Sequence, residues 1–278
     1  MSRATRTRVG GGPLVTLGLV GLALAISLLL FGAPLVMVLG RALAMGWDVY
    51  AEKISDPFTL HAIRLTVITS LVVVPINIGF GLAAAWAITR HQFPGKRLLT
   101  TLIELPVSIS PIVAGVAYLF LYGTLGLLGP FLSDQGWRLM FSVPAIWLAS
   151  LFVTSPYVAR ELITLMQSQG ADEEEAAVSL GAGGWTTFVR VTLPKIKWAL
   201  FYGAVLCNAR VMGEFGAVSI VSGKIRGVTE TLPLHIEVLF NDYNTAGAFA
   251  AASILALLAL VTLFLKSIAE WRLSRERG

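Results

Sequence analysis

The sequence predicts an all-α protein, a polytopic membrane bundle of six transmembrane helices with a helical hairpin in a cytoplasmic loop. Of its 278 residues, 56% are apolar and 13% are charged, about half the charged fraction of soluble domains. Apolar runs long enough to cross a bilayer recur along the chain, and basic residues gather in alternate loops. This composition excludes an ordinary cytosolic enzyme, a disordered chain and an outer-membrane barrel, whose lumen-facing residues would be polar.

Each predicted span is an apolar run close to the roughly 20 residues that a transmembrane helix needs. The six runs cover residues 14–39, 65–89, 98–122, 143–159, 198–223 and 245–265. The first run is too long for the apolar segment of a signal peptide, about 7–15 residues, so we expect it to be retained. One membrane domain is therefore predicted over residues 14–268, with tails at 1–13 and 269–278.

The basic residues predict the orientation of the bundle. Of the 21 lysines and arginines, 14 lie in the terminal and loop segments on the side of the N-terminus, and six lie on the opposite side. This bias predicts that both termini are cytoplasmic. It also explains the net charge of +5 without nucleic acid as a partner. The three histidines and the single Cys207 form no cluster with metal-ligand spacing, so neither a metal nor another cofactor is expected.

The inside loop over residues 167–197 carries the most informative pattern. Asp172 is predicted to cap a helix of about two turns, with Glu175 as its capping-box partner, and Gly181 is predicted to end it in a left-handed conformation. In the helix that follows, Trp185, Phe188 and Val191 recur at three-residue spacing and form an apolar face. That face either marks an interface or packs beneath the protein's own bundle.

These residues resemble a known family. Glu175-Ala176-Ala177, then Gly181, Val191 and Leu193-Pro194 match the EAA signature of ABC importer permeases in every fixed spacing, with Val191 where the family often has Ile. The stretches 209–223 and 231–234 are similar to the sulfate/molybdate branch. Residues 224–227 and 234–237 resemble the W-type subunits of sulfate/thiosulfate importers.

The resemblance implies a permease subunit of an ATP-driven sulfate or thiosulfate importer in the bacterial inner membrane. It implies three kinds of partner: a second homologous permease subunit, two cytoplasmic ATPase subunits and a periplasmic anion-binding protein. The residues implied to couple the permease to the ATPase are Glu175, Ala176, Ala177, Gly181, Phe188, Val191, Leu193 and Pro194. The chain has no phosphate-binding loop of its own, so we expect a non-catalytic subunit.

Four residues inside the apolar runs are candidates for the substrate pathway. Arg210, near the middle of its run, is costly in a membrane and suits a tetrahedral oxyanion, while Glu214 follows it by one helical turn. Ser108 and Ser110 flank a break marked by Pro106 and Pro111. The alternative is that the ion pair only fixes helix packing and that the breaks only kink a helix.

Other functions remain open at this stage. A permease for molybdate, tungstate or phosphate would need the same donors. A secondary transporter is disfavoured because intramembrane carboxylates are scarce. A redox membrane anchor would need paired intramembrane histidines. The outer segment 229–240 is predicted to be an amphipathic helix capped by Thr231, which gates the pathway, meets the binding protein or anchors at the interface.

Overall fold

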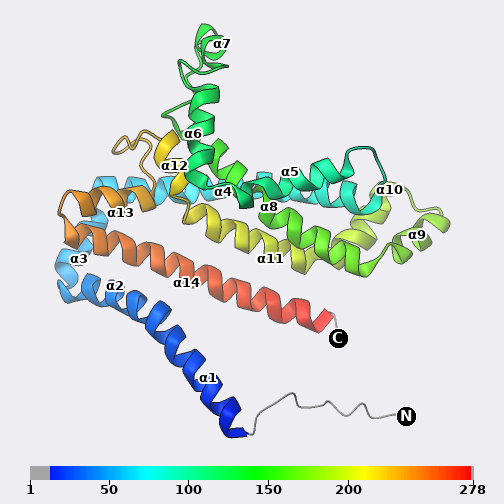
Figure 1. The fold of residues 1–278 in the computed structure, drawn as a ribbon, viewed down its shortest axis with the longest axis horizontal. Coiled ribbons are helices and arrows are strands. Elements are labelled where there is room, and N and C mark those ends of the chain that lie inside the picture. Colours follow the sequence, from blue (N-terminus) through cyan, green and yellow to red (C-terminus); the bar gives the residue numbers. More distant parts are fainter. Residues whose placement is uncertain (1–12, 277–278) are drawn as a thin grey trace.

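The computed structural model describes residues 13–276, which form helices and connecting turns without a β-strand. The elements are α1 Pro13–Ser27, η1 Leu28–Gly32, α2 Ala33–Ala44, α3 Trp47–Ser55, α4 Pro57–Arg90, α5 Lys96–Ser108, α6 Pro111–Tyr122, α7 Gly129–Asp134, α8 Val143–Gln169, α9 Asp172–Ser179, α10 Gly184–Thr187, η2 Phe188–Thr192, α11 Leu193–Met212, α12 Gly216–Val221, α13 Leu232–Asn241 and α14 Thr245–Glu276. Helices α4, α8, α11 and α14 run along the molecule, with α9 and α10 at one end, α3 and α13 at the other, and α12 beside the base of α6 (Figure 1). We call these the α9 end and the α13 end.

The all-α membrane bundle is confirmed, whereas the count of six spans remains a prediction. Within residues 13–276, three helical segments are long and apolar enough to cross a membrane: Val15–Ala44, Pro57–Arg90 and Thr245–Arg272. The bent pair α5–α6 would make a fourth. Helices α8 and α11 pack against each other and against α4 and are not among these segments.

The core lies where α4, α8 and α11 meet. Buried apolar side chains from all three helices pack there, among them Val73, Leu162 and Cys207. Gly81 lets α4 approach α8 closely, because a Cβ at this position would lie 2.8 Å from Cγ1 of Val158. Small residues at helix crossings are typical of membrane bundles, where close packing replaces the hydrophobic effect.

The third apolar run is broken into two helices that differ in direction by 111°. The break falls at Ile109 and Ser110, immediately before Pro111, and Ser110 has an extended backbone (φ −57°, ψ 132°). A residue that precedes proline avoids the helical conformation. Pro106, which the sequence also marks as an interruption, lies within α5 without ending it. Helix α6 then leaves the bundle sideways and leads to α7 (Figure 1).

The described residues cover the predicted terminal tails only in part. Residues 1–12 of the N-terminal tail lie outside the described residues. At the other end, residues 269–276 continue helix α14, so the domain boundary at 268 coincides with no change of structure.

Candidate functional site

The EAA residues form a helical hairpin at the α9 end. Gly181 has φ +85°, and its N–H donates to the carbonyl of Val178 over 2.9 Å, so the predicted left-handed helix end is confirmed. The predicted cap at Asp172 is wrong. Asp172 is the first helical residue and Ala171 holds the cap position, because Gly170, at φ +70°, reverses the chain one residue earlier.

A buried carboxylate fastens this hairpin to the bundle. Glu174 forms an ion pair with Arg90, at the end of α4, and the side chains are only 12% and 14% exposed. Arg90 Nη2 donates to Glu174 Oε1 over 3.3 Å, and Thr192 Oγ1 donates to the same oxygen over 2.6 Å. Sequence reasoning missed this anchor, because Glu174 is one of four consecutive acids and Arg90 lies 84 residues away.

The predicted apolar face divides between the interior and the surface. Phe188 packs edge-on against Trp86 of α4, with ring centroids 5.0 Å apart, and Val191 and Leu193 are half-buried. Trp185 stacks on Phe188 but remains 77% exposed.

The outer surface of the hairpin is therefore a mixture of small, acidic and apolar residues. Its exposed members include Glu175, Ala176, Val178, Leu180, Gly181 and Pro194, and Ala177 is half-buried. Leu180 is 90% exposed. A cavity of about 470 Å³ opens between α9, α10 and the end of α4. All eight predicted coupling residues thus lie at one end of the molecule.

The predicted pair of Arg210 and Glu214 is present. Arg210 Nη1 lies 2.6 Å from Glu214 Oε2, and the side chains are 30% and 1% exposed. The other carboxylate oxygen, Oε1, accepts a hydrogen bond from the backbone N–H of Ala217 over 3.0 Å. Arg210 lies in the last turn of α11, because the helix ends after Met212 and the apolar run continues as α12.

The two serines lie at the other break. Ser108 ends α5 and Ser110 precedes α6, and both are exposed. The breaks lie against each other, because a Cβ at Gly216 would lie 3.0 Å from Cβ of Pro111. A Cβ at Gly115 would lie 2.8 Å from the carbonyl oxygen of Ala217. The structure thus brings the four candidate pathway residues into one region.

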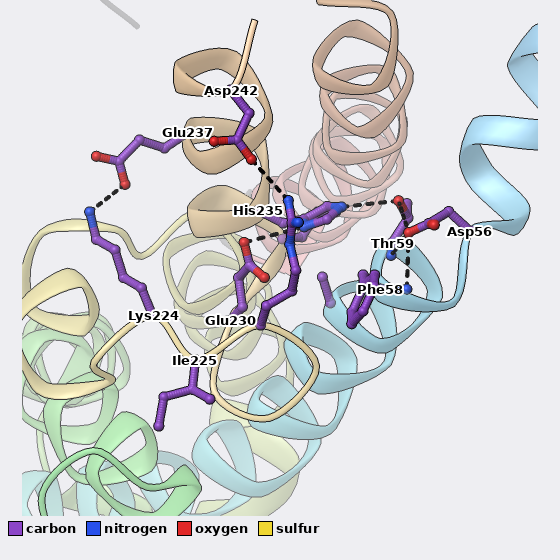
Figure 2. A network of polar contacts seen from close by, with 12 residues as sticks. Asp56, Phe58, Thr59, Lys224, Ile225, Glu230, His235, Glu237 and Asp242 are labelled. Carbon is purple, nitrogen blue, oxygen red and sulfur yellow. Dashed lines mark hydrogen bonds and ion pairs between the residues drawn. The ribbon is translucent and has the colours of Figure 1, made fainter. Parts of the chain in front are cut away.

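A third polar region lies at the α13 end (Figure 2). Glu230 and His235 are each 1% exposed and form a pair at 3.3 Å, while His235 Nε2 lies 3.0 Å from Thr59 Oγ1. Asp56 caps α4 by accepting the backbone N–H groups of Phe58 and Thr59 over 3.0 Å and 3.1 Å. The network joins the loop before α13 to the start of α4.

The helix predicted from residues 229–240 is confirmed as α13. Thr231 holds its cap position, but the Thr231 side chain makes no capping hydrogen bond. The buried Leu232 and Leu239 of α13 pack with Ala248 and Ala251 of α14. The apolar stripe therefore packs against the protein itself. In the part of the chain that the structure describes, no three His, Cys, Asp or Glu side chains are placed to share a metal ion.

An apolar helical bundle with broken inner helices and an EAA hairpin at one end defines a permease of the binding-protein-dependent class. The chain belongs to the family described as "binding-protein-dependent transport system inner membrane component", which matches residues 77–275.

The chain is similar in sequence to permease proteins of sulfate transport systems. The sulfate transport system permease protein CysW of Escherichia coli K12 is 50% identical over 258 residues, covering 93% of this chain and 89% of that protein. The permease protein CysT of the same organism is 34% identical and covers 99% and 98%. Among solved structures, a bacterial alginate ABC transporter in complex with an alginate-bound periplasmic protein has a TM-score of 0.69 at 19% identity, covering 92% of each chain. This last likeness concerns the fold alone.

Proposed function

We propose that this chain is the permease subunit of an ATP-driven importer of sulfate or thiosulfate. The observation that carries the proposal is the EAA hairpin, held on the bundle by Glu174 in a chain that is 50% identical to a sulfate permease protein. The chain forms half of the anion pathway, which extends through the membrane domain of residues 14–268. ATP is hydrolysed on a partner.

The proposed assembly has three kinds of partner. A second, homologous permease completes the pathway, in keeping with the two different sulfate permease proteins among the relatives. Two cytoplasmic ATPases bind beneath the two permeases, and one of them docks on the exposed hairpin surface of this chain around Glu175 and Gly181. A periplasmic binding protein delivers the anion at the α13 end.

This arrangement requires the α9 end and both termini to be cytoplasmic. Cysteine substitutions test the orientation, and the only native cysteine, Cys207, is buried. Asp134→Cys, on α7, should react with an impermeant thiol reagent added to intact cells, whereas Gly183→Cys, in the hairpin, should not. The opposite labelling pattern would invert the assignment.

Arg210 is proposed to attract the anion, with Ser108 and Ser110 as nearby hydrogen-bond donors. A guanidinium can bind two oxygens of a tetrahedral anion at once, and the 30% exposure of Arg210 leaves its side chain accessible. Glu214 pairs with the guanidinium of Arg210 between transport cycles. Its negative charge partly offsets the positive charge of Arg210, so the anion does not bind too tightly to be released.

The experiment compares uptake of labelled sulfate by proteoliposomes that contain the complete importer. Arg210→Ala leaves Glu214 buried and unpaired, so we expect it to impair assembly as well as uptake. The double variant Arg210→Ala/Glu214→Ala removes both charges, a change that is often neutral for stability. It should assemble and bind its ATPase but fail to import. Near-normal uptake by the assembled double variant would contradict the pathway role.

The same proteoliposomes test which anion is carried. Unlabelled thiosulfate should compete with labelled sulfate, whereas molybdate, tungstate and phosphate should compete weakly. Absence of sulfate uptake together with uptake of labelled molybdate or phosphate would assign the chain to another oxyanion importer. Uptake that persists without ATP would indicate a secondary transporter.

A further inference from the structure

Helix α5 presents a polar face to the exterior of the described chain. Arg97, Thr101, Glu104 and Ser108 are all exposed and follow one another at intervals of four, three and four residues. This spacing places them in one row along a helix. We call these four residues the α5 stripe.

The other faces of α5 differ clearly from the stripe. One face is buried, since Leu99 and Ile103 pack with Ala159 and Ile163 of α8. Another face is apolar and exposed, with Leu98 at 63% and Leu102 at 52% exposure. The apolar exposed face suits contact with lipid or with an apolar surface, whereas the stripe does not.

Lipid contact along the stripe would be costly. Helices α5 and α6 together have the length and composition of one broken span, and a charged residue inside a span costs about 2.5–3.5 kcal/mol on insertion scales. Among residues 13–276, Arg97 and Glu104 have no ionic partner. The stripe therefore needs water or a polar surface opposite it.

The α5 stripe connects a basic cavity at the α9 end with the break between α5 and α6. At the α9 end, Arg97 and Thr101 line a cavity of about 790 Å³ whose lining includes Lys96 but no Asp or Glu. At the other end, Ser108 lies at the break that packs against Gly216, close to the pair of Arg210 and Glu214. From Arg97 to Ser108 the helix rises ~16 Å at 1.5 Å per residue, which is about half of the ~30 Å hydrocarbon core.

We propose that the α5 stripe lines a water-filled inner half of the anion pathway, from the region of Arg210 to a basic exit at Lys96 and Arg97. The identity of the anion rests on the proposed function. The presence of water beside α5 rests only on the exposed polar residues of the α5 stripe. Arg97 attracts the departing anion at the exit, and the hydroxyl of Ser108 replaces part of its hydration between the two cations, whereas the hydroxyl of Thr101 donates to the carbonyl of Arg97 over 3.0 Å.

Cysteine accessibility along α5 tests the proposal in the complete importer, reconstituted in lipid nanodiscs. Thr101→Cys and Ser108→Cys are small changes within the stripe, and Leu98→Cys and Leu102→Cys are matched controls on the exposed apolar face of the same helix. The reagent is a charged methanethiosulfonate. The cysteine thiolate attacks its sulfenyl sulfur, which forms a mixed disulfide and releases methanesulfinate, and an apolar environment suppresses thiolate formation. A Cys207→Ala background removes the native thiol.

We expect the two stripe cysteines to react about tenfold faster or more than the two controls. Modification of Thr101→Cys should block sulfate uptake in proteoliposomes, whereas treated Leu98→Cys should transport normally. Unreactive stripe cysteines would overturn the proposal, because the stripe would then be buried against a partner. Equal reactivity at all four positions would also overturn it. If the wild-type importer carries no sulfate, the proposed function fails, while the accessibility pattern still decides whether the stripe faces water.

Discussion

Two adjacent glutamates in the EAA hairpin should respond very differently to the same substitution. Glu174 is 12% exposed and accepts hydrogen bonds from Arg90 and Thr192. Glu173 is 64% exposed and pairs with Lys195 at 2.9 Å. We predict that Glu174→Ala releases the hairpin from the bundle and that Glu173→Ala leaves it in place.

The expected magnitude follows from these contacts. A hydrogen bond to a charged group contributes about 1.5–3 kcal/mol, and removing one partner of a buried pair costs about 3–5 kcal/mol because the other charge remains unpaired. Since Arg90 keeps 14% exposure, we take the lower end, about 3 kcal/mol, for Glu174→Ala. An exposed pair such as that of Glu173 contributes about 0–1 kcal/mol.

Amide hydrogen exchange over residues 171–192 measures this difference directly. A loss of 3 kcal/mol corresponds to exchange about two orders of magnitude faster, since each 1.4 kcal/mol is tenfold. Thr192→Val removes one of the hydrogen bonds to Glu174 and should give an amide exchange rate between those of the two glutamate variants. Sulfate uptake should fall in the same order. Equal exchange rates in Glu174→Ala and Glu173→Ala would refute the reasoning.

Two further predictions use matched substitutions. Gly181→Val places a β-branched residue at φ +85° and should cost about 1–3 kcal/mol of folding free energy, with a sharp loss of sulfate uptake. Gly183→Val, at φ −70° and ψ 157°, should be tolerated. Equal uptake by the two variants would contradict the strain argument. Glu230→Ala leaves the buried Nδ1 of His235 without the carboxylate that lies 3.3 Å away and should lower the free energy of unfolding by about 1–3 kcal/mol, whereas Glu237→Ala, from a half-exposed pair, should cost about 0–1 kcal/mol. Thermal unfolding of the purified importer measures the second difference, and similar melting temperatures would argue against it.

The features that the sequence predicted correctly depend on neighbouring residues. Gly181 ends its helix, Thr231 precedes α13, and Arg210 meets Glu214 one turn later, because each relation spans at most four residues. A break in this run was predicted from Pro106 and Pro111 together, and it falls before Pro111 because proline restricts the residue before it.

The features that the sequence did not reveal are set by tertiary packing. Nothing in a run of four acids distinguishes Glu174, because its burial depends on where the end of α4 lies. The pairing of Thr59 with His235 likewise joins residues 176 positions apart. The end of α11 directly after Arg210 was missed for a related reason, since the apolar run continues through this point.

The two broken helices have a common consequence for transport. A helix end leaves backbone groups without partners in the helix, and such groups are tolerated at membrane depth only if they are buried in protein or line a water-filled cavity. Gly216 lies against Pro111, so both breaks share one location, and the carboxylate of Glu214 satisfies one of the free N–H groups there. Its partner Arg210 keeps a partly exposed guanidinium beside the breaks, and the α5 stripe leads away from the same point. A doubly charged anion needs a continuous polar route of this kind, because apolar helix faces cannot replace its hydration.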